Sequence, residues 1–378
     1  MCLSPRQLNR ATLARQLLLE RESLPPVEAV RRLLALQAQE PVSPYLALWN
    51  RLRDFDAGEL DAAFRSYEVV KAPLMRITLH AVAAEDHAMF RQAVRTTLRA
   101  ARLNDSRFRS TGLSIGDADA LVPHVVAFAR RPRRRDEVEA MLAERLGSAP
   151  EPGLWWALRT VAPLVHAPTG GPWSFNRSPS YVAPPDSHEP GDPAAPTRQL
   201  VLRYLEAFGP ASRRDFAQFA LLRQADLRPA FEALADELQT VQAPDGSTLY
   251  DVAGAPLPDG DSPAPPRLLA MWDSVLLAHS DRSRVIPPPY REHVIRRNGD
   301  VLPTVLVDGF VAGVWRPVGG GIEITTFSAL PDDAWEGIAR EAGALLAWLD
   351  ERDGAVYGRY AHWWARLPAA QVRVVARA

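Results

Sequence analysis

The chain of 378 residues contains a single cysteine, Cys2. One cysteine excludes an internal disulfide and fits a reducing cytoplasm. No apolar run reaches the roughly 18 residues that a membrane span needs. The N-terminus carries arginines and lacks the continuous apolar core of a signal peptide. We therefore expect a soluble, cytoplasmic protein that does not contact a membrane.

The common signatures of enzymes are also missing. The sequence has no GxxxxGK[ST] phosphate loop and no GxSxG elbow. Its eight histidines are scattered, without cysteine or histidine partners at metal-ligand spacing. The glycine run at 319–321 is more economically interpreted as a hairpin turn than as a nucleotide cradle. These absences predict no metal and no cofactor.

Lysine is almost absent, because Lys71 is the only lysine among 44 basic residues. The net charge of −1 argues against a uniformly basic DNA binder, but the arginines are clustered. Arg91, Arg95 and Arg99 recur at the spacing of one helix face, and Arg282 and Arg284 begin another basic stretch. A solvated face neutralised by acids elsewhere is the alternative to a surface that follows DNA phosphates.

Residues 197–253 show the clearest local pattern. Apolar residues recur at helical spacing up to Phe208, and Ser212 with Asp215 forms a candidate capping box for a second helix. A third helix follows, and TVQAPDGSTLYDV indicates two strands around a Pro-Asp-Gly turn. This order, three helices and a hairpin, is that of a winged helix.

The same order can be found twice upstream, and the C-terminal part is β-rich. We therefore predict an α+β fold with three tandem winged-helix motifs and a barrel-like C-terminal unit. Proline-rich stretches at 183–196 and 254–266 are expected to be exposed linkers, and Asp308-Gly309 marks a hairpin turn. The predicted boundaries are 1–84, 85–196, 197–265 and 266–378.

Two neutral carboxamides, Gln37 and Gln39, stand at the end of the apolar run LLALQAQEP. On a continuous helix their side chains would point about 200° apart. However, Glu40 precedes Pro41, which disfavours helix there. If the chain is extended near Ala38, both carboxamides project to one side. Such a pair can orient a water molecule, although ordinary hydrogen bonding at a helix end is the alternative.

Four segments together resemble the tandem winged-helix DNA glycosylases of the AlkZ type. They are LQAQ at 36–39, LMRITLHAV at 74–82, LVLRYLEAFGPASRRDF at 200–216 and LLAHSDRSRVI at 276–286. The most specific element is the Gln-apolar-Gln motif; the YcaQ-like subfamily carries Asp at the second position. The resemblance implies a C-shaped basic cradle for double-stranded DNA, and a monomer. It also implies hydrolysis of the N-glycosidic bond of N7-alkylated purines, including crosslinked ones, as in self-resistance to azinomycin-type agents.

The resemblance and the residue patterns together give a set of site candidates. Gln37 and Gln39 are the expected catalytic pair. Lys71 is expected to be an exposed charge on the wing, so no amine is available to nick the DNA backbone. A non-catalytic winged-helix regulator is the alternative function, which the lack of a ligand-sensing or dimerisation segment disfavours. The residues expected to contact DNA are Arg76, His80, Arg91, Arg95, Arg99, Trp173, Arg177, His279, Arg282, Arg284, Val307, Asp308, Gly309 and Phe310.

Overall fold

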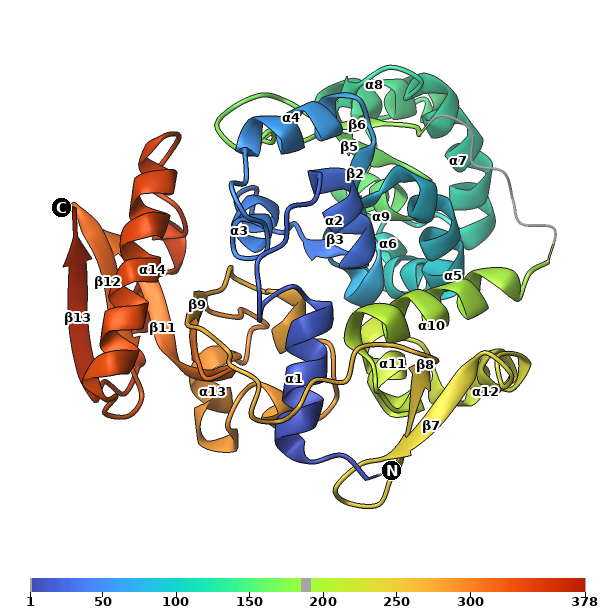
Figure 1. Ribbon diagram of the computed structural model, residues 1–378. Coiled ribbons are helices and arrows are strands. Elements are labelled where there is room, and N and C mark those ends of the chain that lie inside the picture. Colours follow the sequence, from blue (N-terminus) through green and yellow to red (C-terminus); the bar gives the residue numbers. More distant parts are fainter. Residues whose placement is uncertain (1, 185–191, 378) are drawn as a thin grey trace.

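The structure is a computed structural model that describes residues 2–184 and 192–377. It mixes helices with antiparallel sheets, as predicted for an α+β fold. Three helix-rich units come first along the chain, and a sheet-rich unit forms the C-terminal part (Figure 1). No helix within the two described ranges is long and apolar enough to cross a membrane.

The first unit contains the two glutamines. Its first helix begins at Pro26, where the fixed φ of proline suits the first helical turn. The elements of this unit are α2 (Pro26–Arg32), β1 (Leu36–Gln37), α3 (Ser43–Trp49), α4 (Ala57–Arg65), β2 (Val69–Pro73), the 3-10 turn η1 (Met75–Ile77) and β3 (Leu79–Ala83).

The second unit shares a sheet with the first. Strands of both units form one six-stranded sheet in the order β1-β3-β2-β5-β6-β4, joined where Lys71 of β2 pairs with His166 of β5. The predicted boundary at residue 84 therefore does not separate two sheets. The elements of the second unit are α5 (Ala84–Leu103), α6 (Ser106–Arg109), α7 (Ile115–Phe128), β4 (Arg133–Arg134), α8 (Arg135–Leu146), α9 (Pro152–Val161), β5 (Val165–Ala167) and β6 (Ser180–Val182).

The third unit follows its sequence pattern closely. The capping box of Ser212 and Asp215 is present at the start of the second helix, and the hairpin forms as predicted, with a bridge between Ala211 and Tyr250 beside it. The third helix is shorter than expected, because Leu238 already belongs to the hairpin. The elements are α10 (Ala195–Phe208), α11 (Arg213–Ala220), α12 (Gln224–Ala233), β7 (Leu238–Gln242) and β8 (Thr248–Val252).

The C-terminal unit is an open sheet in the order β13-β12-β11-β10-β9. Its outer strands do not pair with each other, so it is not a closed barrel, which corrects the barrel-like prediction. The predicted Asp308-Gly309 turn joins β10 to β11, with positive φ at both residues, as a two-residue hairpin requires. The elements are β9 (Arg267–Leu268), η2 (Ser274–Leu276), η3 (Arg282–Arg284), η4 (Pro288–Tyr290), α13 (Arg291–Val294), β10 (Thr304–Val307), β11 (Phe310–Val318), β12 (Gly321–Thr326), α14 (Asp332–Asp350), η5 (Gly358–Arg366) and β13 (Gln371–Ala376).

Contacts far apart in sequence join these units. Helix α1 (Pro5–Arg15) packs against α10 and η3, and lies between the third and C-terminal units (Figure 1). Arg15 and Asp251 form a buried ion pair there, 2.6 Å between Nη1 and Oδ1. One apolar core contains Tyr45 and Phe64 of the first unit together with Trp315 of the C-terminal unit. The first and C-terminal units therefore share an interior.

Candidate functional site

The glutamine motif lies on a short strand, and the helix before it ends earlier than the apolar run suggested. Helix α2 stops at Arg32, and Leu34 has a φ of 71°, which no helix accommodates. The chain is then extended, and Leu36 and Gln37 pair with Ala81 and His80 of β3. The leucines before the motif, Leu33, Leu34 and Leu36, are buried, but they do not form one face of a helix.

The backbone is extended as far as Gln37, and the convergence of the two glutamine side chains stays a prediction. Leu36 and Ala38 both enter the core shared with the C-terminal unit. Because side chains alternate along an extended chain, Gln37 projects to the opposite side, and Gln39 lies in the bend that follows. The Ala38 amide continues the pairing by donating to the Leu79 carbonyl at 2.8 Å.

Gln37 and Gln39 have different surroundings. Gln37 is 3% exposed. Its Oε1 accepts hydrogen bonds from the backbone N–H groups of Ala38 (2.8 Å) and Gln39 (3.2 Å), and its Nε2 donates to Thr78 Oγ1 (3.2 Å). The Gln39 side chain is exposed. Gln37 therefore fixes the backbone of Gln39, and Gln39 presents its carboxamide to solvent.

Behind Gln37 lies a short chain of polar contacts. His80 is fully buried, and its Nδ1 donates to the Thr78 carbonyl at 3.0 Å. Burial, followed by the charge of Arg76, lowers the pKa of His80 to about 3. The neutral ring therefore keeps its other nitrogen, Nε2, as an acceptor for Arg76 Nη2 at 3.4 Å. His80 positions Arg76, which corrects the prediction that His80 contacts DNA directly.

Arg76 lies in a turn between two strands. It sits in η1 with a φ of 54°. Its guanidinium packs over the Phe219 ring, 4.9 Å from the centroid, and donates to the Phe219 carbonyl at 3.3 Å. Burial and then the charge of Arg282 lower its pKa to about 10. Arg76 therefore belongs to a group of cations formed with the segment after residue 278.

We call Arg76, Arg282 and Arg284 the basic cluster. All three are half-buried, and backbone carbonyls accept from each: Phe219 for Arg76, His279 for Arg282 and Pro210 for Arg284. Asp215 lies near the last two, but its carboxylate already accepts from Ser212 and Ser280. The cluster therefore joins three predicted DNA-contacting arginines in one place.

His279 supports this cluster from inside. It is 3% exposed, and its Nε2 is 3.0 Å from the Phe208 carbonyl. Burial, and next the charge of Arg284, lower its pKa to about 3, so the ring is neutral at pH 7. A carbonyl partner requires Nε2 to be the donor. His279 is a structural residue here, and not the surface contact that was predicted.

The loop with Trp173 and Arg177 divides into a buried and an exposed part. Trp173 is 5% exposed and packs between Tyr45 and Trp348, with ring centroids 5.2 and 5.6 Å away. It is therefore a core residue, which corrects its predicted contact with DNA. Arg177 is exposed, and its contact with DNA stays a prediction.

The 307–310 turn is docked onto α1. Asp308 accepts from Arg6 at 2.7 Å and also from Arg10, whose side chain is buried. Asn9 Nδ2 donates to the Gly309 carbonyl at 2.9 Å, and any Cβ on Gly309 would meet Asn9 and Arg10 at less than 3 Å. Glycine is thus required where the turn meets the helix. Val307 and Phe310 are half-buried, so only these flanks and the Asp308 side chain reach the surface.

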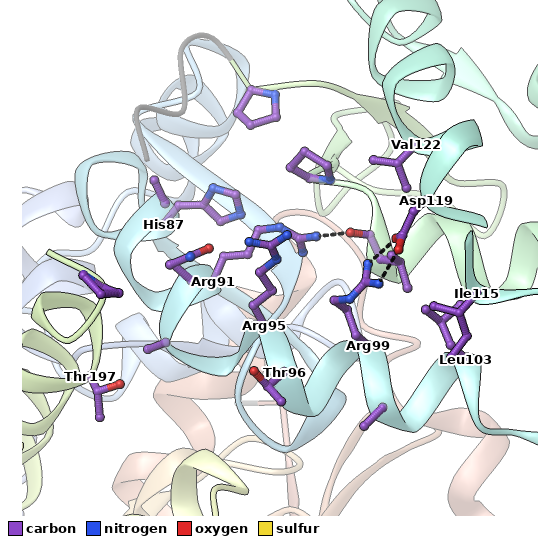
Figure 2. A pocket seen from close by; sticks show the side chains of 18 of the residues that line it. His87, Arg91, Arg95, Thr96, Arg99, Leu103, Ile115, Asp119, Val122 and Thr197 are labelled. Carbon is purple, nitrogen blue, oxygen red and sulfur yellow. Dashed lines mark hydrogen bonds and ion pairs between the residues drawn. The ribbon is translucent and has the colours of Figure 1, made fainter. Parts of the chain in front are cut away.

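The α5 arginines face α7 rather than the glutamines. Arg91, Arg95 and Arg99 line a hollow of about 940 Å³ between the two helices (Figure 2). Arg91 donates to the carbonyls of Thr160 (3.2 Å) and Val161 (2.5 Å) at the end of α9, and burial lowers its pKa to about 10. Arg99 pairs with Asp119 at 2.7 Å. The predicted helix face exists, but it is separate from the basic cluster.

Lys71 is not the exposed charge that was expected. It is 4% exposed, its Nζ lies 4.6 Å from the Phe175 ring centroid, and burial lowers its pKa to about 8. The strand register decides where it points. Lys71 and Leu36 both pair with Ala81, whereas Gln37 pairs with His80. Lys71 therefore projects from the face of the sheet opposite Gln37.

Sequence reasoning missed the residues that hold the motif from the C-terminal unit. Arg359 and Tyr360 both donate to the Glu40 carboxylate, and Tyr357 contacts Ser43. No local signal relates η5 to residues about 320 positions earlier. Among residues 2–184 and 192–377, no group of three or more His, Cys, Asp or Glu side chains is placed to hold a metal ion.

The fold and the motif can be compared with known proteins. The family model described as DNA glycosylase AlkZ-like matches residues 30–348, so the chain belongs to this family of DNA glycosylases. The interstrand DNA cross-link repair glycosylase of Streptomyces sahachiroi is 27% identical over 343 residues, which cover 85% of this chain and 90% of that protein. The solved structure of the S. sahachiroi DNA glycosylase AlkZ matches 92% of this chain and 96% of its own, with a TM-score of 0.76 and 23% identity. This structural likeness shows a common fold.

Proposed function

We propose that this protein hydrolyses the N-glycosidic bond of N7-alkylated purines in double-stranded DNA and thereby unhooks interstrand crosslinks. The observation that carries the proposal is the Gln37-Ala38-Gln39 segment at the end of β1, in which one glutamine fixes the backbone of the other. The name of the S. sahachiroi relative, an interstrand DNA cross-link repair glycosylase, supports crosslinked DNA as a substrate. Crosslinks of the azinomycin type are the ones that the family resemblance implies.

The chemistry suits a site without a strong acid or base. A purine alkylated at N7 carries positive charge and leaves without protonation. A transition state with oxocarbenium character then needs a positioned water and electrostatic support. Gln39 would orient this water through its carboxamide oxygen. The Gln37 oxygen already accepts hydrogen bonds from two backbone N–H groups. Gln37 would therefore act by holding the Gln39 backbone and by donating hydrogen bonds from Nε2.

The basic cluster is the proposed contact for DNA phosphates near the glutamines. Its arginines are fixed by carbonyl acceptors, which leave their charges uncancelled by direct ion pairs in the described residues. Held cations of this kind attract phosphates and release counterions on binding. The α5 arginines, Arg177 and the 307–310 turn are proposed as outer contacts of the same duplex.

The proposed cradle rests on a repeated order of elements. Each of the first three units has a helix, a short strand or bridge, two helices and a hairpin, and we interpret each unit as a winged helix. The three units and the C-terminal sheet would together bind one DNA duplex, and the protein would act as a monomer.

We further propose that the enzyme leaves an intact strand with an abasic site. Enzymes that also nick the backbone usually form a Schiff base through a lysine of lowered pKa. Lys71 has such a pKa, about 8, but it projects from the other face of the sheet and lies under Phe175. The side chain that carries the amine is therefore directed away from the proposed water site.

Release of a modified base tests the proposed function directly. Duplexes that carry N7-methylguanine, or an azinomycin crosslink, are incubated with excess protein, and abasic sites are revealed by alkali. We expect strand breaks after alkali at the modified positions and none in unmodified DNA. The Gln37→Ala, Gln39→Ala double variant should bind the same DNA without releasing base. Binding by the wild-type protein without any base release would favour a non-catalytic DNA binder.

A further inference from the structure

The segment that carries the proposed water-orienting residue is tied to the C-terminal unit. Glu40 directly follows Gln39, and its Oε1 accepts a hydrogen bond from Tyr360 Oη at 2.8 Å. The same oxygen accepts from Arg359 Nη2. The Glu40 side chain is 17% exposed, whereas that of Arg359 is 59% exposed. A largely buried carboxylate is therefore held by one phenol and one guanidinium of η5.

A second contact fixes the same segment three residues later. Ser43 Oγ and Tyr357 Oη lie 2.9 Å apart, and Tyr357 Oη also accepts from the Met271 backbone N–H at 3.2 Å. The hydroxyl of Tyr357 is thus placed by the backbone of the C-terminal unit. Ser43 N–H in turn donates to the Glu40 carbonyl at 3.1 Å. The turn after Gln39 is held both by its own backbone and by the C-terminal unit.

The electrostatics favour this arrangement at neutral pH. Burial, followed by the charge of Glu40, raises the pKa of Tyr360 above its ordinary value, so the phenol stays protonated and remains a donor. The two groups that face Glu40 from η5 are therefore a neutral donor and a cation. The ammonium group of Lys71, from β2, also interacts with the Glu40 carboxylate. The charge of Glu40 raises the pKa of Lys71 and so opposes the lowering by burial.

We propose that Glu40, Arg359 and Tyr360 are positioning residues that hold the Gln39 carboxamide in its reactive place. This inference rests on the proposed function and assigns the C-terminal unit a role in the chemical step, besides any contact with DNA. Gln37 fixes the Gln39 backbone from the N-terminal side, and Glu40 fixes it from the C-terminal side. A weak catalyst such as a carboxamide depends on position, so loss of either restraint lowers the rate.

The experiment compares Tyr360→Phe, Arg359→Ala and Glu40→Gln with a matched variant, Arg352→Ala. Arg352 also joins the C-terminal unit to the first unit, through a 2.7 Å contact with Asp61 that lies outside the glutamine segment. Single-turnover base release from N7-methylguanine DNA and the Kd for the same DNA are measured for each. We expect the three Glu40-contact variants to release base about 10- to 100-fold more slowly, with Kd changed less than about twofold. Arg352→Ala should keep the wild-type rate.

Two further measurements separate positioning from other roles. In a double-mutant cycle, Tyr360→Phe combined with Glu40→Gln should cost little more than the larger single effect, because both remove one contact. Hydrogen exchange of the Ala38 and Gln39 amides should quicken in Tyr360→Phe and not in Arg352→Ala, whether or not base release is detected. A wild-type protein without base release refutes the proposed function, whereas unchanged rates and unchanged exchange in Tyr360→Phe overturn the positioning role.

Discussion

Single alanine substitutions should show that the two glutamines do different work. Gln37 makes three hydrogen bonds, two from backbone N–H groups at 2.8 and 3.2 Å and one to Thr78 at 3.2 Å. Each such bond contributes about 0.5–1.5 kcal/mol, so Gln37→Ala is expected to lower the free energy of unfolding by about 1.5–4.5 kcal/mol. Gln39 is exposed, so Gln39→Ala should change the free energy of unfolding by less than about 0.5 kcal/mol.

Base release should fall in both variants, whether or not the variant loses stability. Removing one group that supports the transition state costs about 10²- to 10³-fold in rate, and we expect at least this reduction in Gln39→Ala despite its unchanged stability. Gln37→Ala should be slowed by a similar factor, because the Gln39 backbone is no longer fixed. The Kd for N7-methylguanine DNA should remain within about twofold in both, since neither carboxamide is placed to bind phosphate.

Urea denaturation and single-turnover base release measure the two effects on the same preparations. Thr78→Val serves as the control for Gln37, because it removes the Nε2 acceptor and keeps the contacts of Oε1. It should cost less stability than Gln37→Ala. If Gln39→Ala keeps the wild-type rate, or is as easily unfolded as Gln37→Ala, the division of roles is wrong.

Three other predictions concern pH, salt and the reaction product. Burial lowers the pKa of His80, His87 and His279 to about 3, whereas each ring takes up a proton near pH 6.5 in the unfolded chain. The free energy of unfolding should therefore fall as the pH drops below 6.5, by about 1.4 kcal/mol per pH unit for each ring. A flat profile in thermal melts between pH 7.5 and 5 would contradict this. Replacing Arg95 and Arg99 by alanine should reduce the slope of log K against log salt by about 0.9 for each DNA phosphate that the variant no longer neutralises, and an unchanged slope means a merely solvated face. Borohydride should trap no covalent DNA adduct; an adduct that disappears in Lys71→Ala would show a Schiff base.

Signals that act over a few residues were interpreted correctly from the sequence. The capping box of Ser212 and Asp215 and the Asp308-Gly309 turn both occur where expected. In both cases the deciding interaction lies within four residues. The extended chain at Gln37 was expected because Pro41 disfavours helix at Glu40, but its cause lies earlier, since the helix ends at Arg32 and Leu34 has a φ of 71°. The change from helix to strand therefore occurs several residues earlier than Pro41 indicated.

Contacts between distant segments account for the wrong predictions. Trp173 looked like an exposed loop residue, but its partners Tyr45 and Trp348 lie on other elements. Asp308 looked free on a hairpin tip, but Arg6 and Arg10 are about 300 residues earlier. Lys71 is buried because β2 pairs with β5 of the next unit and becomes an inner strand. None of these contacts can be predicted from the sequence around either partner.

The exposure of Gln39 bears on the substrates that the site is able to take. A glycosylase that encloses its target must swing the nucleotide out of the helix into a pocket. A purine joined to the opposite strand cannot follow that path completely. Gln37 is 3% exposed, but Gln39 reaches the surface in the bend that follows the strand, and Thr78, the partner of Gln37, is half-buried. In the proposed mechanism, a water held by Gln39 would lie at the boundary between protein and DNA, where it would approach a sugar whose base has not left the duplex.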